Sequence, residues 1–371
     1  MTERWDAIVV GAGAMGSATA WWLARRGRSV LLLERFEQGH GRGSSHGGAR
    51  IFRFAYPDVD YVRLAQQALP LWRELEDEAG VPLVDQLGGV DHGRPDAVQA
   101  VADALAAAGT PGEWVPSAEA EERWPGFRFE GPVLFSASGG RCRADDAVRA
   151  LQDRAAAHGA DVRFGEGAES VLAGPGGDEA VVRTAAGEHR APVAVVTAGS
   201  WVAKLLGASV PLPPTVVTRE QPVHFPAADP AAEPTWPSFI HHREPWTYGC
   251  ATPAEGVKVG LHHTGPLVDP DERDFEVDAP LVARVVEYVE RWLPGLRPEP
   301  RFPTTCLYTT TPDEDFVLDR RGPIVVASPC SGHGFKFTPV IGRILADLAD
   351  GRPGPGGRFS LPAPAPAAGG R

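Results

Sequence analysis

The first forty residues contain a glycine-rich turn between two apolar runs, and this feature constrains the fold most strongly. Residues 5–10 (WDAIVV) lead into GAGAMG at residues 11–16, and a second apolar run ends at Glu34. A buried strand would end in a tight turn at Gly11, while Gly13 would admit a pyrophosphate and Gly16 a closely packed helix. The Glu34 carboxylate would accept hydrogen bonds from an adenosine ribose. The pattern predicts a dinucleotide-binding βαβ unit, without separating FAD from NAD.

Size, charge and cysteine usage narrow the class of protein. A chain of 371 residues that is 43% hydrophobic can bury a sizeable core, and its length favours two lobes. The net charge of -12, without a long basic run, argues against nucleic acid and anionic membranes as partners. No apolar stretch has the length of a membrane span. We therefore expect a cytoplasmic enzyme with a small-molecule ligand. The scattered cysteines, which favour neither a disulfide framework nor a metal site, are Cys142, Cys250, Cys306 and Cys330.

The rest of the chain alternates helical and strand-like patterns. A hairpin is expected near 181–187, and buried strands at 193–199 and 324–327. Proline and aromatic residues mark 216–300 as part of a second lobe. The last residues, 353–371, are mostly Pro, Gly and Ala and are expected to be loose. Helices are predicted at 14–26, 61–75 with a kink at Pro70 and an end at Gly80, 96–107, 145–158, 280–292 and 338–349.

The segment GVKVGLH carries polar residues at alternate positions. As a strand, it places Lys258, Gly260 and His262 on one face and packs its valines on the other. An exposed polar face is the plain interpretation. A glycine between two polar groups would instead leave room for a ligand, and we favour that functional interpretation.

Two further segments contain chemistry that suits a flavin. SGHGFKF, residues 331–337, precedes a helix with Pro339 in its first turn, and its N–H groups would stabilise the negative charge of a reduced flavin. In GSSHGGARIFRFAY, residues 43–56, a helical conformation would place Arg50, Arg53 and Tyr56 on one face. Arginines among apolar neighbours favour a clamp for a carboxylate or for the flavin.

Together these segments identify a resemblance. The chain resembles the FAD-dependent amine oxidases typified by monomeric sarcosine oxidase and N-methyltryptophan oxidase, within the D-amino-acid-oxidase-like superfamily. The resemblance runs from residue 5 to about residue 351. It rests on GAGAMG, the GSSHGGARIFRFAY block, the KVGLH strand, and CLYTTTPDE followed by SGHGFKF.

The resemblance implies an α/β fold of two lobes. One is a Rossmann-type FAD-binding domain and the other a substrate-binding domain built on an antiparallel sheet. Residues 1–83, 142–215 and 301–352 are assigned to the FAD-binding domain, and residues 84–141 and 216–300 to the substrate-binding domain. The resemblance further implies oxidation of an N-methyl or cyclic amino acid to an imine by a monomeric enzyme, with oxygen as acceptor and hydrogen peroxide as product.

The resemblance also implies roles for individual residues. Cys306 would form a thioether to the flavin, Arg53 and Lys336 would bind the substrate carboxylate, and Lys258 would lie near flavin N5 and speed the reaction with oxygen. Arg50 and His46 would lie against the flavin ring. The expected catalytic or substrate-pocket residues are Lys258, Arg53, Lys336, His262, Tyr308 and Tyr248. The expected FAD contacts are Gly11, Gly13, Ala14, Met15, Gly16, Glu34, Arg35, Ser44, His46, Arg50, Cys306, Gly332, Gly334, Phe335 and Lys336.

Some positions depart from the family pattern and leave alternatives open. Pro329 and Cys330 stand where the family usually has glycine and phenylalanine, so Cys330 is a second candidate for flavin attachment. The strand with His241, His242 and Trp246 is not a close copy of the sarcosine enzyme, so the substrate is left open. The rival functions are a flavin dehydrogenase that passes electrons to a protein or quinone, a nicotinamide-dependent dehydrogenase, and a catalytically silent flavoprotein.

Overall fold

The structure is a computed structural model that describes residues 4–207, 209–229, 236–328 and 331–363. The chain divides into two compact units. The first unit comprises Met1–Ser45, Val148–Val217 and Tyr308–Arg371, and the second comprises His46–Ala147 and Thr218–Leu307. Three elements run across these residue boundaries: α5 (Ala144–Ala157), β14 (Val216–Glu220) and β20 (Cys306–Thr310).

The first unit is built on a six-stranded sheet with the order β21-β22-β13-β1-β2-β9. Its strands are parallel except for β21, which pairs with β22 in the antiparallel sense. A separate antiparallel sheet has the order β10-β11-β12. The elements are β1 (Ala7–Val10), α1 (Ala14–Arg25), β2 (Val30–Glu34), β9 (Asp161–Phe164), β10 (Ala168–Ala173), β11 (Ala180–Thr184), β12 (Gly187–Ala191), β13 (Ala194–Val196), η1 (Gly199–Trp201), α6 (Val202–Leu206), β21 (Leu318–Arg321), β22 (Ile324–Ala327), η2 (Phe335–Phe337), α8 (Thr338–Ala349) and η3 (Gly357–Phe359).

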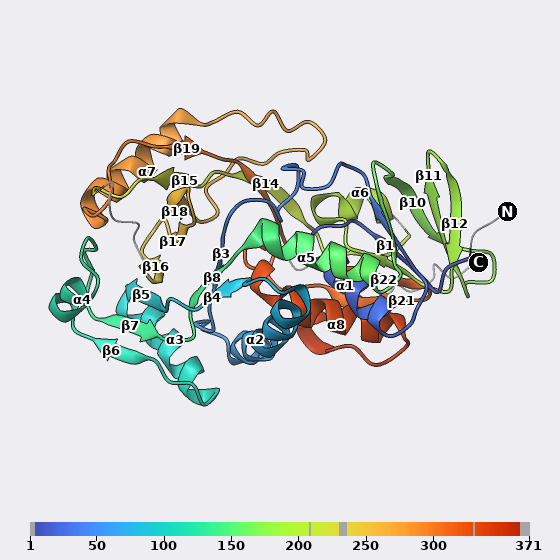
Figure 1. The fold of residues 1–371 in the computed structure, drawn as a ribbon, viewed down its shortest axis with the longest axis horizontal. Coiled ribbons are helices and arrows are strands. Elements are labelled where there is room, and N and C mark those ends of the chain that lie inside the picture. The colour runs from blue at the N-terminus through green and yellow to red at the C-terminus, as the bar shows by residue number, and fades with distance from the viewer. Residues whose placement is uncertain (1–3, 208, 230–235, 329–330, 364–371) are drawn as a thin grey trace, which may run out of the picture. The chain divides into compact units, whose positions relative to one another are not determined.

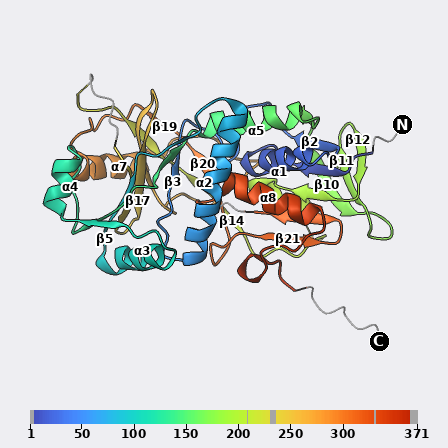
Figure 2. The same ribbon diagram turned by 60° about the horizontal axis from the view of Figure 1, so that its bottom comes forward.

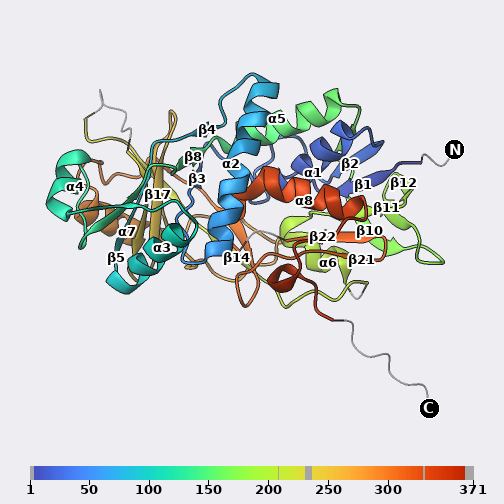
Figure 3. The same ribbon diagram turned by 90° about the horizontal axis from the view of Figure 1, so that it is seen from below.

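Continuous apolar runs explain this parallel sheet. Every residue of β1, β13 and β22 is buried, as expected for parallel strands covered on both faces. Helices α1 and α8 lie side by side in two views (Figures 2 and 3), and Trp22 Nε1 donates a hydrogen bond to the Pro339 carbonyl at 2.9 Å. The arrangement β1-α1-β2 confirms the predicted βαβ unit, and the observed β11, β12, β13 and β22 agree with the predicted strands.

The second unit contains an eight-stranded sheet with the order β19-β15-β18-β17-β16-β5-β7-β6 (Figure 1). It is antiparallel apart from one pair, β16 with β5. A smaller sheet has the order β3-β8-β4. The elements are β3 (Arg50–Phe52), α2 (Val59–Ala79), β4 (Val84–Asp85), β5 (Gly89–Gly93), α3 (Pro95–Ala107), β6 (Glu113–Val115), α4 (Ser117–Arg123), β7 (Val133–Ser136), β8 (Gly140–Cys142), β15 (Val223–Phe225), β16 (Ser238–His242), β17 (Thr247–Thr252), β18 (Gly256–Leu261), α7 (Ala279–Trp292) and β19 (Phe302–Pro303).

One face of the eight-stranded sheet forms the core of the second unit. Val257 and Val259 of β18 belong to a buried cluster that also contains Leu281, Val285 and Val289 of α7. The predicted alternation is therefore confirmed for residues 257–261, because Val257, Val259 and Leu261 pack in the core and Lys258 takes the opposite face, whereas His262 lies beyond the end of the strand. That opposite face carries the polar residues described below.

Local capping accounts for the long helix α2. Asp58 caps its start by accepting a hydrogen bond from Asp60 N at 2.9 Å, and Gly80 ends it in the left-handed conformation. Pro70 lies inside the helix. The sequence did not anticipate α4. The helical arrangement considered for Arg50, Arg53 and Tyr56 is wrong, because residues 50–52 form strand β3 paired with β8.

The C-terminal segment differs in part from the loose tail that we expected. Arg358 Nε donates to Asp315 Oδ2 at 2.8 Å, and Leu361 N donates to Asp319 Oδ2 at 2.9 Å. These bonds hold residues 358–361 against residues 315–319 of the same unit, while residues 364–371 lie outside the described part of the chain. Within the described residues, no helix combines the length and the apolar character needed to cross a membrane.

Candidate active site

The turn after β1 has the geometry that a dinucleotide phosphate requires. Gly11 has φ +97°, and a Cβ there would lie 2.8 Å from the Thr197 carbonyl oxygen. A Cβ on Gly16 would lie 1.8 Å from the Gly11 carbonyl oxygen. Both positions therefore demand glycine. Beside Gly13, by contrast, the only described heavy atom within 4 Å of an added Cβ is Ser45 Oγ at 3.2 Å, so this side of the turn has room for a phosphate.

The side chains around the turn hold its backbone in place. Ala14 N donates to Ser45 Oγ at 3.0 Å, and Gln152 Nε2 of α5 donates to the Ala12 carbonyl at 2.8 Å. Sequence reasoning chose Ser44 and missed Ser45 and Gln152. The GSSHGG block was the only signal for Ser45, and nothing near Gln152 points to this turn. The expected FAD contacts of Ala14, Met15, Arg35 and Ser44 stay predictions.

Glu34 is buried and fixes the same turn. Its Oε2 accepts a hydrogen bond from Ala12 N at 2.8 Å, and its Oε1 accepts one from Phe36 N at 3.1 Å. His40 Nε2 lies 3.4 Å from Oε1. A carboxylate oxygen can accept more than one hydrogen bond, so these contacts leave acceptor capacity for a ribose hydroxyl. The arrangement fits FAD, and the ribose contact itself stays a prediction.

The segment before α8 contains Lys336, and Tyr308 of β20 packs against the same segment within the first unit. Gly332 has φ +74°, and a Cβ there would lie 2.4 Å from Tyr308 Cε2, so the tyrosine ring lies against this glycine. Lys336 is 5% exposed, and its Nζ donates to the His333 carbonyl at 2.7 Å. A buried ammonium next to a helix start is suited to an anionic ligand. Cys330, the rival attachment site, lies outside the described residues.

In the second unit, strand register assembles a polar surface that we call the lysine face. It lies opposite the α7 core on the eight-stranded sheet. His224 pairs with Lys258, which in turn pairs with Cys250. In the next row, Ile240 pairs with both Tyr248 and Asp91. We define the lysine face by six of its residues: His224, Lys258, Cys250, Tyr248, Asp91 and His242.

Lys258 is at the centre of this face and is fully enclosed. Burial, reinforced by the positive charge of Arg50, lowers its pKa from 10.5 to about 8. Its Nζ donates a hydrogen bond to the Ala49 carbonyl oxygen. The same oxygen accepts from Arg50 Nη1 at 2.9 Å, and Arg50 Nη2 donates to the His46 carbonyl at 2.5 Å. The structure thus brings together three residues that the sequence selected: Lys258, Arg50 and His46.

A histidine and a glutamate beside Lys258 were missed by sequence reasoning. His224 Nε2 lies 3.2 Å from Glu255 Oε2. Burial and the positive charge of Lys258 lower the pKa of His224 to about 3, so this ring is neutral. Burial raises the pKa of Glu255, while Lys258 opposes that effect. Of these two residues, the negative charge of Glu255 raises the pKa of Lys258, whereas His224 receives the effect of the lysine charge.

Arg53 also reaches the lysine face. Its Nη1 is 3.5 Å from Asp91 Oδ1, and its guanidinium carbon is 4.6 Å from the centroid of the Tyr56 ring. Burial raises the pKa of Tyr56. Among the described residues, Arg53 Nη1 has no hydrogen-bond acceptor. Asp91 in turn contacts His242 Nε2 at 2.7 Å. Arg53 therefore combines a partly buried positive charge with a buried donor that has no acceptor among the described residues.

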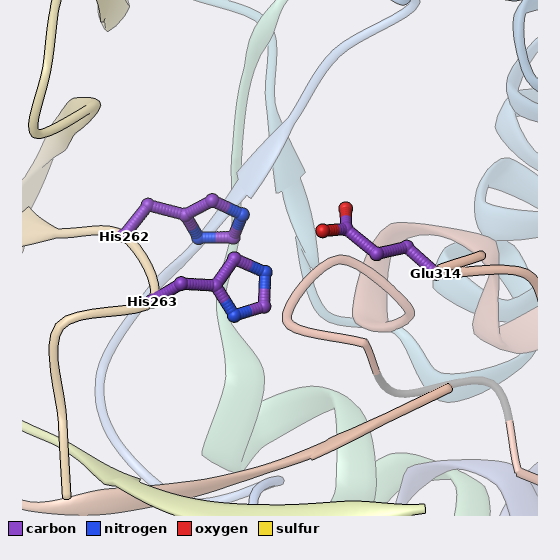
Figure 4. A group of neighbouring side chains, drawn as sticks. All are labelled: His262, His263 and Glu314. Carbon is purple, nitrogen blue, oxygen red and sulfur yellow. The ribbon is translucent and has the colours of Figure 1, made fainter. Parts of the chain in front are cut away.

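The aromatic side of the lysine face differs from one expectation. A Cβ on Gly260 would lie 2.6 Å from both Cζ and the hydroxyl oxygen of Tyr248, so the tyrosine ring fills the space that we had reserved for a ligand. His262 follows β18, and its ring is 6.3 Å from the Tyr248 ring in an edge-on arrangement. His262 and His263 lie next to each other with ring centroids 4.0 Å apart (Figure 4).

Cys306 begins β20 and is 8% exposed. Its thiol is close enough to Lys258 to influence the pKa of the lysine electrostatically, as is Cys250. Cys306 and Lys258 are thus neighbours in the second unit. The proximity agrees with a shared role at one cofactor, and the covalent bond stays a prediction.

Comparison with known proteins identifies the family. Residues 6–348 match the family described as FAD dependent oxidoreductase. The chain belongs to this family. The match confirms the FAD dependence, the oxidoreductase class and the family resemblance that the sequence motifs predicted.

Relatives of known name extend this result. Peroxisomal sarcosine oxidase of Mus musculus is 36% identical over 94% of this chain and 93% of its own. Monomeric sarcosine oxidase of Bacillus sp. strain NS-129 is 33% identical over 94% of each chain. The structure of NikD, an unusual amino acid oxidase essential for nikkomycin biosynthesis, matches with a TM-score of 0.86 and 27% identity over 97% of this chain and 98% of that one. The predicted two-lobe α/β flavoenzyme fold is therefore confirmed.

Proposed function

We propose that this flavoenzyme oxidises a secondary amino acid, either N-methylated or cyclic, at a carbon beside the nitrogen. The names of its relatives, sarcosine oxidase and amino acid oxidase, support this substrate class. The observation that carries the proposal is the unused donor of Arg53 beside the lysine face, because an amino acid offers a carboxylate to such a donor. FAD supplies the acceptor for the hydride equivalent.

The protein's own residues bind and orient the substrate in this proposal. Arg53 donates charge-assisted hydrogen bonds to the carboxylate, and Lys336 provides the second positive charge. Tyr248, Tyr308 and His262 border the substrate and exclude water. The imine product then hydrolyses, which gives an aldehyde and an amine from an N-methyl substrate. A cyclic amino acid gives a cyclic imine.

Lys258 serves the oxidative half of the reaction. A buried ammonium stabilises the negative charge that develops when oxygen accepts electrons, and hydrogen peroxide is the product. A dehydrogenase that passes electrons to a protein or quinone would have no use for this charge. Stoichiometric peroxide release under air therefore distinguishes the oxidase from that rival, and absence of peroxide would refute the assignment of oxygen as acceptor.

The remaining assignments concern the cofactor and the state of the protein. Cys306 carries the flavin covalently, while Arg50 and His46 lie against its ring. We retain 1–83, 142–215 and 301–352 as the FAD-binding segments and 84–141 and 216–300 as the substrate-binding segments. We also propose a cytoplasmic monomer.

The visible spectrum provides the direct test. Purified protein is mixed anaerobically with sarcosine, other N-methyl amino acids, proline and pipecolate in turn. Bleaching of the flavin band by one of these compounds supports the proposal and identifies the substrate class. A flavin band that none of them bleaches would refute it, and would favour a specialised cyclic amine of the kind that the likeness to a biosynthetic amino acid oxidase suggests.

A further inference from the structure

A buried aspartate and histidine on the lysine face form a dyad that the family assignment does not explain. Asp91 Oδ1 lies 2.7 Å from His242 Nε2, and each side chain is 3% exposed. The pair joins β5 to β16, and the register of these parallel strands directs both residues away from the α7 core. Such a carboxylate fixes the orientation of an imidazole ring and stabilises its charged form.

The second ring nitrogen of His242, Nδ1, differs from Nε2 in its surroundings. Nδ1 is buried, and among the described residues it has no hydrogen-bond partner. With Nε2–H donated to Asp91, Nδ1 carries the lone pair of a neutral imidazole. A buried acceptor without a hydrogen bond is unfavourable, so the lone pair in this position is suited to a donor on a ligand.

The dyad is connected to the proposed carboxylate site through Asp91. Arg53 Nη1 lies 3.5 Å from the same Oδ1 atom that contacts His242. In an amino acid, the nitrogen is two bonds away from the carboxylate carbon. A substrate whose carboxylate binds Arg53 therefore brings its ammonium group to the neighbourhood of the dyad.

Two histidines on the core face of the sheet interact electrostatically with His242, and burial keeps their pKa values low. His92 and His241 lie on the core face, stacked with ring centroids 4.0 Å apart. Burial is the main cause that lowers both of their pKa values, and the charge of His242 contributes to each. His241 also contacts Glu130, which pairs with Arg243. On the lysine face, Asp91 is the negative group in contact with His242 and Arg53 the positive group behind it, while the Trp246 ring packs edge-on at 5.1 Å.

We infer that His242, held by Asp91, accepts the proton of the substrate ammonium before oxidation. The N–H bond of the ammonium breaks, the proton bonds to His242 Nδ1, and the electron pair stays on the substrate nitrogen. That pair then forms the C=N bond when the hydride equivalent leaves the neighbouring carbon. The imidazolium is balanced by Asp91 and returns its proton to solvent after product release. This inference rests on the proposed function, since it requires an amino acid substrate.

Two carboxylate ligands test the inference through binding, without turnover. α-Aminoisobutyrate has an ammonium group but no hydrogen on the carbon beside it, and methoxyacetate replaces the amine with an ether oxygen. Titration of the flavin absorbance gives the Kd of each ligand. We expect His242→Phe to weaken α-aminoisobutyrate by about 10- to 100-fold, as for a lost charge-assisted hydrogen bond, and to leave methoxyacetate within about threefold. Asp91→Asn should give the same selectivity, and serves as the test if His242→Phe does not fold.

The matched control is Glu130→Gln. Glu130 contacts the neighbouring histidine, His241, at 3.0 Å from the opposite face of the same strand. A general disturbance of β16 would weaken ligand binding in this variant as well. A specific loss of the proton acceptor would weaken binding only in the His242 and Asp91 variants. We expect both ligands to bind Glu130→Gln as they bind the wild type.

A pH profile of anaerobic flavin reduction adds a kinetic readout. Without the proton acceptor, the His242→Phe variant reacts only with substrate that is already deprotonated in solution. Its kcat/KM should rise about tenfold per pH unit up to the pKa of the substrate ammonium, where it approaches the wild-type value. The wild type should show a weaker dependence over the same range.

The outcomes separate this inference from the proposed function. Equal loss of both ligands in His242→Phe and Asp91→Asn, or no loss in either variant, would overturn the role of the dyad. Wild-type protein that binds methoxyacetate but not α-aminoisobutyrate would also overturn it, with carboxylate recognition intact. If the wild type binds neither ligand, the proposed amino acid site fails and the inference fails with it.

Discussion

The charge of Lys258 should make the reaction with oxygen depend on pH in a defined direction. Burial and the charge of Arg50 lower the lysine pKa from 10.5 to about 8. At 1.36 kcal/mol per pH unit, this lowering disfavours the charged form by about 3 kcal/mol. The ammonium is present below the pKa and is lost above it. The rate at which oxygen reoxidises the reduced flavin should therefore fall as the pH rises through about 8.

Variants of two residues make this prediction specific. Glu255 stabilises the Lys258 ammonium, so Glu255→Gln should move the midpoint to lower pH. Lys258→Arg keeps its charge throughout the range and should abolish the pH dependence near 8, because an arginine pKa exceeds about 12. Lys258→Met should be slow at every pH and should slow reoxidation far more than reduction.

Stopped-flow mixing of anaerobically reduced enzyme with oxygenated buffer measures the rate directly. Flavin reduction by substrate, measured on the same preparations, is the control half-reaction. A wild-type reoxidation rate that stays constant or increases across two pH units on either side of the midpoint would refute the role of the ammonium. Equal slowing of both half-reactions by Lys258→Met would also refute it.

Three further substitutions test the remaining assignments. Arg53→Ala should weaken substrate binding by about 2–4 kcal/mol, seen as a raised KM, whereas an unchanged KM for a carboxylate substrate would exclude the assignment. Cys306→Ala should make the flavin extractable with acid, and retention of covalent flavin would direct attention to Cys330. Gly16→Ala would place a Cβ 1.8 Å from the Gly11 carbonyl oxygen, so the flavin-to-protein ratio and Tm should both fall; a normal ratio would show that the turn can adjust.

The sequence predicted the parts of the fold that depend on local patterns. Glycines, apolar runs and an acidic residue at regular spacing were enough for the β1-α1-β2 unit, and alternation was enough for the two faces of β18. Residues 50–52 show the limit of that approach. Their arginine spacing suited a helix, but pairing with β8, about ninety residues later, makes them a strand.

The partners of the predicted site residues could not be predicted from local patterns either, because they are distant in the sequence and come together only in the folded sheet. Lys258 and Arg53 were found through motifs, whereas sheet pairing places His224 beside Lys258 and Asp91 on the strand next to His242. Asp91 and His242 are 151 positions apart, and no local sequence pattern indicates that they are in contact. Isolated histidines and aspartates are common in sequences, so the signal appears only when register is known.

The same register that aligns the dyad also buries the core, and this links the site to stability. In β16, Phe239 pairs with Val90 within the α7 core, while the adjacent Ile240 pairs with Asp91 on the lysine face. A slip of β16 by one residue would exchange its two faces, moving His242 among the apolar side chains of the α7 core and Phe239 onto the lysine face. The apolar face therefore determines the register. The free energy lost by exposing its apolar side chains is larger than the free energy gained from any single polar contact on the lysine face. Polar residues on that face can vary with the substrate while the fold is maintained from the other side of the sheet.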